Sequence, residues 1–361
     1  NKGQNKARHG TWVCGRNTDM KQAEHPCPSS ATRYTQSHPP ALVLAGPTCS
    51  GKSALALRLA QQLGGVVINA DSMQVYKDLR VLTARPDVAE EQRVPHRLYG
   101  VLPAAHKGSV AWWREQALAA MQQAWHAGQM PILCGGTGMY LRALTDGLAQ
   151  IPQSPPAVQQ AARALVAEEG APAVHARLMV VDPQTASRLK PVDSQRVARA
   201  WEVWQATGHG LDWWQAQPGL PPAPARFVAV RLDPSRVELR ARIQARFAAM
   251  LEQGGVEEVR ALLQQNLDPD LPVMRAHGVP ELAAMLLGEI TQAEAASRAV
   301  AATGRYTKRQ ATWFAHHPLT AEGLTCMVNA CFPDFEQFSE RKYDEIVSFI
   351  LKGIDAPNIG S

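Results

Sequence analysis

The feature that most constrains the fold is Gly46-Pro-Thr-Cys-Ser-Gly-Lys-Ser53, which fits the phosphate-loop pattern G-x-x-x-x-G-K-[ST]. An apolar run precedes it at residues 41–45, and leucines at positions 55, 59 and 63 follow it at helical spacing. In a strand, loop and helix of this kind, successive backbone N–H groups at the helix N-terminus form a concave, partly positive site for a di- or triphosphate. The motif therefore predicts a loop that binds ATP, another nucleotide or a diphosphate.

The side chains of this loop predict how an anion would be held. We expect Lys52 to lie along the phosphates as a point charge and the Ser53 hydroxyl to ligate Mg2+, the one cofactor that we expect. Kinases, NTPases and transferases all use such a loop, so it does not name the reaction. The residues assigned to phosphate binding are Gly46, Pro47, Thr48, Cys49, Ser50, Gly51, Lys52 and Ser53.

Later segments predict an α/β fold. Further strand patterns at residues 66–70, 131–134 and 227–232 alternate with helical patterns at about 110–127, 235–265 and 291–314. This alternation predicts a P-loop NTPase-like parallel sheet flanked by helices on both faces. An Ala-, Gln- and Trp-rich stretch predicts a helical insertion domain. The predicted units are a disordered or mis-assigned leader (1–40), a catalytic core (41–150 and 223–317), the insertion (151–222) and an unassigned tail (318–361).

Composition narrows the setting. The chain is 45% hydrophobic and 19% charged, and it has no apolar stretch near the roughly 20 residues of a membrane helix. Its six cysteines are too widely spread for a disulfide framework, and none forms a CxxC pair. We therefore expect a cytoplasmic protein without membrane contact, working as a monomer. The net charge of +5 suits a polyanionic partner but does not by itself indicate nucleic-acid binding.

The acidic residues near the loop depart from those of a common NTPase. An NTPase carries an acid at the end of a later strand to hold Mg2+, whereas residues 131–134 run into Gly-Gly-Thr-Gly. Asp71, after the second strand, is the acid at a strand end near the loop. It is either a general base facing the phosphate site or a helix cap or outer Mg2+ ligand.

Further motifs stand in a fixed order, and together they identify a family. After the phosphate loop come Ile68-Asn-Ala-Asp-Ser-Met-Gln-Val-Tyr76, Val94-Pro-His96, Gly135-Gly-Thr-Gly-Met-Tyr-Leu141, Asp193-Ser-Gln-Arg196, Leu232-Asp-Pro234, Met274-Arg-Ala276 and Lys308-Arg-Gln310 with Trp313-Phe314. In these motifs the chain resembles the tRNA dimethylallyltransferase (tRNA isopentenyltransferase) family, from about residue 41 to 317.

This resemblance implies transfer of a dimethylallyl group from dimethylallyl diphosphate to the exocyclic amine of the adenosine 3′ of a tRNA anticodon. The phosphate loop would hold a diphosphate rather than hydrolyse a nucleotide, with Lys52 among the catalytic groups, Asp71 as general base and Thr137 as a contact near the reacting amine. The implied contacts with the tRNA anticodon stem-loop are Asp71, Ser72, Met73, Gln74, Thr137, Gln159, Gln195, Arg196, Val197, Ala198, Arg199, Arg275, Ala276, His277, Gly278, Val279, Pro280, Lys308, Arg309, Gln310, Ala311, Thr312, Trp313, Phe314 and Ala315.

Two groups of basic residues suit this reaction. Arg242 and Arg246 share one face of a helix and are candidates to hold the departing diphosphate; the alternative is a solvated basic face. From Arg298 to Arg309 the chain has four positive charges and no acid, on a helix that also carries Tyr306 and Trp313. Phosphate contacts and aromatic rings suit a single-stranded RNA loop, although an exposed basic helix with core aromatics has the same pattern.

Two other functions stay open on the sequence alone. In a small-molecule or nucleoside kinase, Asp71 would activate a hydroxyl for attack on a γ-phosphoryl group. A non-catalytic RNA-binding module would keep only a decayed loop, yet Gly51, Lys52, Ser53, Asp71 and Thr137 are all present.

Overall fold

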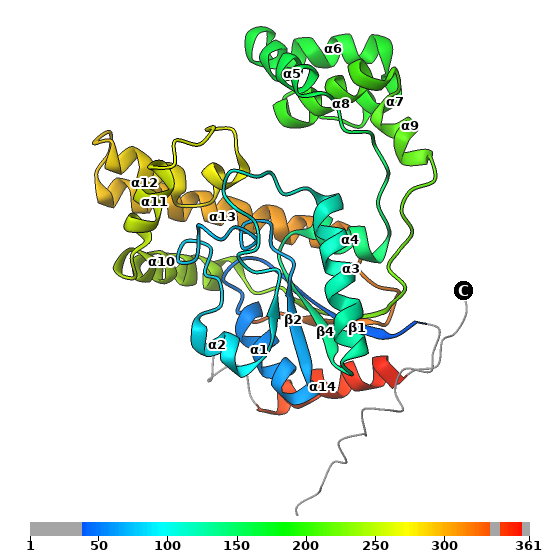
Figure 1. Ribbon diagram of the computed structural model, residues 1–361, viewed down its shortest axis with the longest axis vertical. Helices are drawn as coiled ribbons and strands as arrows, with labels where there is room; N and C mark the ends of the chain where they lie inside the picture. The colour runs from blue at the N-terminus through cyan, green and yellow to red at the C-terminus, as the bar shows by residue number, and fades with distance from the viewer. Residues whose placement is uncertain (1–37, 333–339, 356–361) are drawn as a thin grey trace, which may run out of the picture.

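The computed structural model describes residues 38–332 and 340–355. Its centre is one six-stranded sheet in the order β3-β2-β4-β1-β5-β6, and every neighbouring pair is parallel (Figure 1). This confirms the predicted parallel sheet with flanking helices. The strands are β1 (Pro40–Ala45), β2 (Gly65–Asn69), β3 (His96–Arg97), β4 (Met130–Gly135), β5 (Arg226–Leu232) and β6 (Thr325–Val328).

Helices cover both faces because the strands are apolar on both sides. On one face, α1 (Lys52–Leu63) and α14 (Glu340–Asp355) pack against alternate strand residues such as Leu42 and Val230. On the other face lie α3 (Val110–His126) and α4 (Gly138–Thr145). The short α2 (Val88–Arg93) precedes β3 and begins with a capping box at its N-cap residue, Asp87. Among the described residues, none of the helices has the length and apolar character needed to span a bilayer.

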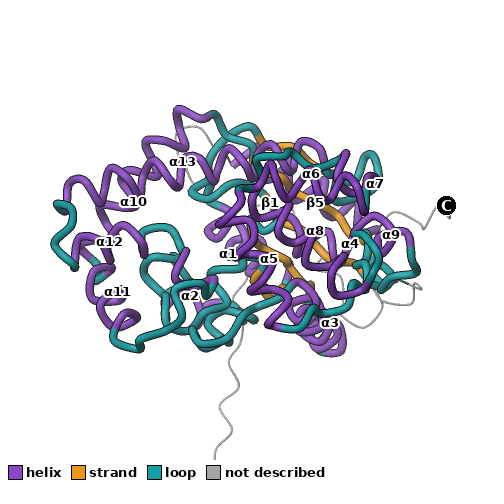
Figure 2. Tube along the Cα trace, turned by 90° about the horizontal axis from the view of Figure 1, so that it is seen from above, coloured by secondary structure: helices purple, strands orange, loops and turns teal. Residues whose placement is uncertain are grey.

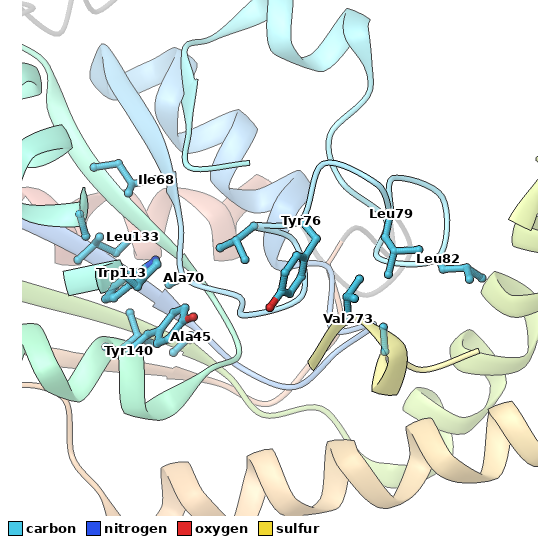
Figure 3. Close-up of a cluster of buried hydrophobic side chains, with 14 of the residues drawn as sticks. Ala45, Ile68, Ala70, Tyr76, Leu79, Leu82, Trp113, Leu133, Tyr140 and Val273 are labelled. Atoms are coloured by element: carbon cyan, nitrogen blue, oxygen red, sulfur yellow. The ribbon is translucent and has the colours of Figure 1, made fainter. Parts of the chain in front are cut away.

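The larger core continues from the sheet into a second group of helices. Figure 3 shows Trp113 and Tyr140 beside the sheet, and Leu79, Leu82 and Val273 at the other end of the same cluster. The Trp113 and Tyr140 rings stack with centroids 4.4 Å apart. The second group of helices contains α10 (Arg236–Glu252), α11 (Gly255–Leu263), η1 (Pro272–Arg275), α12 (Val279–Leu286) and α13 (Gln292–His316). The single helix expected over residues 235–265 is two helices, because Gly254 takes a left-handed conformation with φ 98°.

The tail left unassigned by the sequence belongs to the sheet. β6 pairs with β5, and α14 buries Ile346, Ile350 and Ile354 against the face that α1 also covers. The core therefore extends past residue 317, and Pro40, placed in the leader by sequence, already belongs to β1. The rest of the predicted leader, residues 1–37, lies outside the described residues.

A separate helical layer stands where the insertion was expected. It contains α5 (Pro156–Glu169), α6 (Ala171–Val181), α7 (Pro183–Ser187), α8 (Ser194–Thr207) and α9 (Leu211–Ala216). These helices bury small cores of their own, for example Val174 against Val197. Two extended segments join them to the sheet layer, paired at Leu148 and Leu220 (Figure 1). Viewed from above, α5, α6 and α8 lie over β1 and β5, while α10 to α13 lie to one side (Figure 2).

Candidate active site

Three predicted site segments meet at the carboxyl edge of the sheet. The phosphate loop follows β1, Asp71 follows β2 and Thr137 follows β4. The strand order places β4 between β2 and β1, so these three strand ends are neighbours although they come from distant parts of the sequence. Ligand sites of open parallel sheets form at this edge. The fold thus brings together the catalytic residues that the sequence suggested.

The β2 end is held by buried Asn69. Its Nδ2 donates to the carbonyl of Asp71 at 3.0 Å and to that of Leu98 at 3.0 Å, and its Oδ1 accepts from the Asp71 amide at 2.8 Å. The Asp71 Oδ1 in turn accepts from the amide of Met73 at 2.9 Å. Asp71 therefore caps the turn that follows it, much as the capping alternative expected. The same bond holds the carboxylate in place at the strand end.

Thr137 connects the ends of β2 and β4. Its amide donates to the carbonyl of Ala70 at 3.1 Å, and its Oγ1 accepts from the amide of Ser72 at 3.0 Å. The phenol of Tyr306, on α13, lies beside this hydroxyl. Burial is the main cause that raises the Tyr306 pKa, and the nearby Asp71 charge adds to it, so Tyr306 stays a neutral phenol beside the carboxylate.

Lys52 lies inside the same site. Its Nζ donates to the Pro47 carbonyl at 2.8 Å. Burial lowers the pKa of Lys52, the charge of Asp71 raises it, and that of Arg246 lowers it again. The ammonium group is thus close enough to Asp71 and Arg246 to feel both charges. The positive charge of Lys52 at the phosphate loop therefore lies near the Asp71 carboxylate at the end of β2.

The phosphate loop is packed from behind by the segment after β6. Phe332 donates its amide to the Ser50 carbonyl at 2.9 Å. Gly51 has φ 89°, and a Cβ added there would lie 1.4 Å from the Phe332 carbonyl oxygen, so only glycine fits this close approach. Sequence patterns gave no sign of this contact, because it joins the loop to a segment nearly 300 residues away that carries no recognisable motif.

The two candidate arginines on α10 have different surroundings. Arg242 Nη1 donates to the Phe332 carbonyl at 3.2 Å, so it ties the packing segment to the helix. Arg246 Nη1 lies 3.6 Å from the Cys49 Sγ in the phosphate loop, and its charge acts on Lys52. Arg246 therefore contacts the loop itself, whereas the bond of Arg242 goes to the segment packed behind the loop.

The Thr48 amide, assigned to phosphate binding by sequence, is engaged by a protein side chain. It donates to the Gln310 Oε1 at 2.9 Å. Gln310, assigned to tRNA contact, is 4% exposed. It reaches inward to the phosphate loop and to the loop after β4 that carries Thr137.

The predicted tRNA segments divide into exposed and buried positions. Gln195, Arg196, Arg275, Pro280, Lys308, Arg309, Thr312 and Ala315 are exposed. Asp71, Ser72, Met73, Gln74, Thr137, Gln159, Arg199, His277, Ala311 and Trp313 are partly exposed. The side chains of Val197, Ala198, Ala276, Val279, Gln310 and Phe314 are buried in cores or against the loops, and Gly278 is buried as well, so an RNA in contact with these segments would meet their neighbours instead.

The oxygen groups at the loop suit a hard cation that is shared with a substrate. Within the ranges 38–332 and 340–355, no group of three or more His, Cys, Asp or Glu side chains is arranged to hold a metal ion. Mg2+ keeps several waters and is commonly held by one or two protein oxygens together with substrate phosphates. The exposed Ser53 hydroxyl, at the first turn of α1, supplies such an oxygen, and the predicted Mg2+ site fits on this ground.

Comparison with known proteins assigns the family. The model of the family described as IPP transferase matches residues 74–317. A tRNA dimethylallyltransferase from Gluconobacter oxydans (strain 621H) is 61% identical over 317 residues, which are 88% of this chain and 95% of the relative.

Solved structures share the fold of this chain. The tRNA isopentenylpyrophosphate transferase of Bacillus halodurans is 28% identical with a TM-score of 0.61, covering 87% of this chain and 97% of that one. A eukaryotic dimethylallyltransferase acting on tRNA has the same fold, with a TM-score of 0.74 at 24% identity, over 90% of this chain and 81% of that one. On this evidence, the chain belongs to the IPP transferase family.

Proposed function

We propose that this protein transfers the dimethylallyl group of dimethylallyl diphosphate to the exocyclic amine of the adenosine 3′-adjacent to a tRNA anticodon. Its curated relatives are named tRNA dimethylallyltransferases. The observation that carries the proposal is the meeting of three groups at one edge of the sheet: the cationic phosphate loop with Lys52, the Asp71 carboxylate and the Thr137 hydroxyl. A donor diphosphate and an acceptor amine would each find a matching group there.

The reaction breaks the C–O bond between the prenyl group and the diphosphate, and it forms a C–N bond to the adenine. The exocyclic amine is a weak nucleophile because its lone pair is delocalised into the ring, so a base that takes its proton during bond formation is useful. Asp71 is the base in this proposal. Thr137 would hold the amine in line, and its own hydroxyl accepts a hydrogen bond from the Ser72 amide.

Negative charge builds on the leaving diphosphate in the transition state. Preorganised positive groups stabilise that charge most when it is fully developed, and this lowers the barrier to the chemical step. We assign this role to Lys52, Arg246 and the amides of residues 51–53. When bound, Mg2+ held by Ser53 and the diphosphate neutralises part of the same charge.

The tRNA would lie against exposed basic side chains near the same edge. Lys308 and Arg309 are exposed on α13, the helix that supplies Tyr306 to the site. In the insertion, Arg196 is exposed at the start of α8, and Arg163 of α5 pairs across to Asp270 at 3.1 Å. Because the target amine belongs to a stacked anticodon loop, the adenine would turn out of the loop to reach Thr137.

We also propose that the protein works as a cytoplasmic monomer with Mg2+. Free thiols persist in a reducing compartment. The four cysteines within the described ranges, Cys49, Cys134, Cys326 and Cys331, are free, which supports this setting.

The direct test is incubation of unmodified tRNA with labelled dimethylallyl diphosphate and Mg2+. We expect label in the tRNA, and loss of at least about 100-fold in kcat for Asp71→Asn with donor binding largely kept, since general-base catalysis contributes about 10²- to 10⁴-fold. The matched control is Asp87→Asn, at an exposed cap of α2 where asparagine also caps well. Wild-type kcat in Asp71→Asn would remove Asp71 as the base, and phosphorylation of a substrate by ATP without prenyl transfer would favour the kinase.

A further inference from the structure

The side chain of Gln310 joins the two loops that would hold donor and acceptor. Its Oε1 accepts from the Thr48 amide at 2.9 Å, in the phosphate loop after β1. Its Nε2 donates to the Gly136 carbonyl at 3.0 Å, in the loop after β4 that also carries Thr137. One planar amide thus bridges two loops that are distant in sequence, from a third element, α13.

The bridge begins where the sheet ladder ends. β1 and β4 are paired through Ala45 and Gly135, and beyond that pair the two chains separate into their loops. Gln310 bonds to Gly136, one residue beyond the end of β4, and to Thr48, three residues beyond the end of β1. Beyond the last backbone pair of the two strands, the Gln310 side chain therefore connects the two loops.

The fit around this amide is tight. A Cβ added at Gly136 would lie 2.1 Å from the Gln310 Nε2 and 3.2 Å from the Gly46 carbonyl oxygen. The amide is therefore wedged between the loops with no room for a methyl group. A buried amide with both ends hydrogen-bonded fixes the separation of its partners, because either loop could move only by leaving a buried polar group unpaired.

Helix α13 has other attachments at this edge, so Gln310 is not needed to dock it. One turn earlier, Tyr306 lies beside the Thr137 hydroxyl. One turn later, Trp313 packs so closely on Gly138 that a Cβ there would lie 2.2 Å from its ring, and the Phe314 carbonyl accepts from Arg231 Nη1 at 2.8 Å. Loss of the Gln310 amide would leave these contacts of α13 in place. Only the distance between the two loops would no longer be held.

We propose that Gln310 is a positioning residue that sets the distance between the phosphate loop and Thr137, and so between the bound prenyl carbon and the attacking amine. This rests on the proposed function, in which the loop holds the donor and Thr137 the acceptor. A displacement of about 1 Å between reacting groups can cost on the order of 100-fold in rate without changing how tightly either substrate binds.

The test uses the full chain and compares Gln310→Met, which keeps the volume but loses both hydrogen bonds, with Gln292→Met at an exposed position of the same helix. We expect kcat for prenyl transfer to fall about 10- to 100-fold in Gln310→Met. Dissociation constants for dimethylallyl diphosphate and tRNA should change less than about threefold, as placement rather than binding is lost. The control should match the wild type.

A double-mutant cycle with Thr137→Val separates positioning from a general packing role. If Gln310 acts by placing Thr137, Gln310→Met should cost clearly less in kcat when the Thr137 hydroxyl is already absent, and additive losses would overturn the proposal. Wild-type kcat in Gln310→Met would overturn it as well. Should Gln310→Met fail to fold, Gln310→Asn replaces it, because its shorter side chain cannot span both loops and should show the same split. A wild-type protein without prenyl transfer would instead refute the proposed function.

Discussion

Ile350 offers the sharpest test of whether the C-terminal segment belongs to the core. It is 0% exposed on α14 and packs with Val228 and Leu55 in the cluster beneath the sheet. Ile350→Ala removes three carbons worth about 0.8 kcal/mol each when buried, before any cavity cost. The neighbouring side chains cannot fill the cavity that is left. The unfolding free energy should therefore fall by about 3 to 4 kcal/mol.

The assay is chemical denaturation followed by tryptophan fluorescence, with Val237→Ala as the control. Val237 is 81% exposed on α10, so its truncation should change the unfolding free energy by less than about 0.5 kcal/mol. A loss below about 1 kcal/mol in Ile350→Ala would show that α14 does not pack as described. That result would also undermine the account of Phe332 behind the phosphate loop, because Phe332 is buried in the same cluster as the apolar side chains of α14.

Two further predictions concern charge. Arg246→Gln should weaken binding of inorganic diphosphate by about 10- to 100-fold, the range of a charge-assisted hydrogen bond, as followed by calorimetry. Arg242→Gln, whose partner is the Phe332 carbonyl, should change it less, and an equal loss in both would contradict the assignment of Arg246. Lys308→Ala or Arg309→Ala should each reduce the slope of log K against log salt for tRNA binding by about 0.7 to 0.9, whereas Lys352→Ala, exposed on α14, should leave the slope unchanged.

Local patterns were informative wherever a backbone conformation has its own chemical signature. The phosphate loop was predicted from Gly46 to Ser53 because glycines, a lysine and a hydroxyl at fixed spacing are what an anion-binding nest requires. The strands at 66–70 and 131–134 are continuous apolar runs, and β2 and β4 agree with them within one or two residues. The elements of the tail were not predicted, because β6 is short and the hydrophobic stripe of α14 follows a stretch without a clear pattern.

The sequence by itself determined which groups the site contains: a phosphate loop with Lys52, a carboxylate at Asp71 and a hydroxyl at Thr137. It did so because each follows an apolar strand, and parallel strands end at one edge. Only the tertiary structure decided how these groups are spaced and supported. Buried Gln310, read from sequence as an RNA contact, turns its amide inward, since which face of a helix is covered depends on partners far away in the chain.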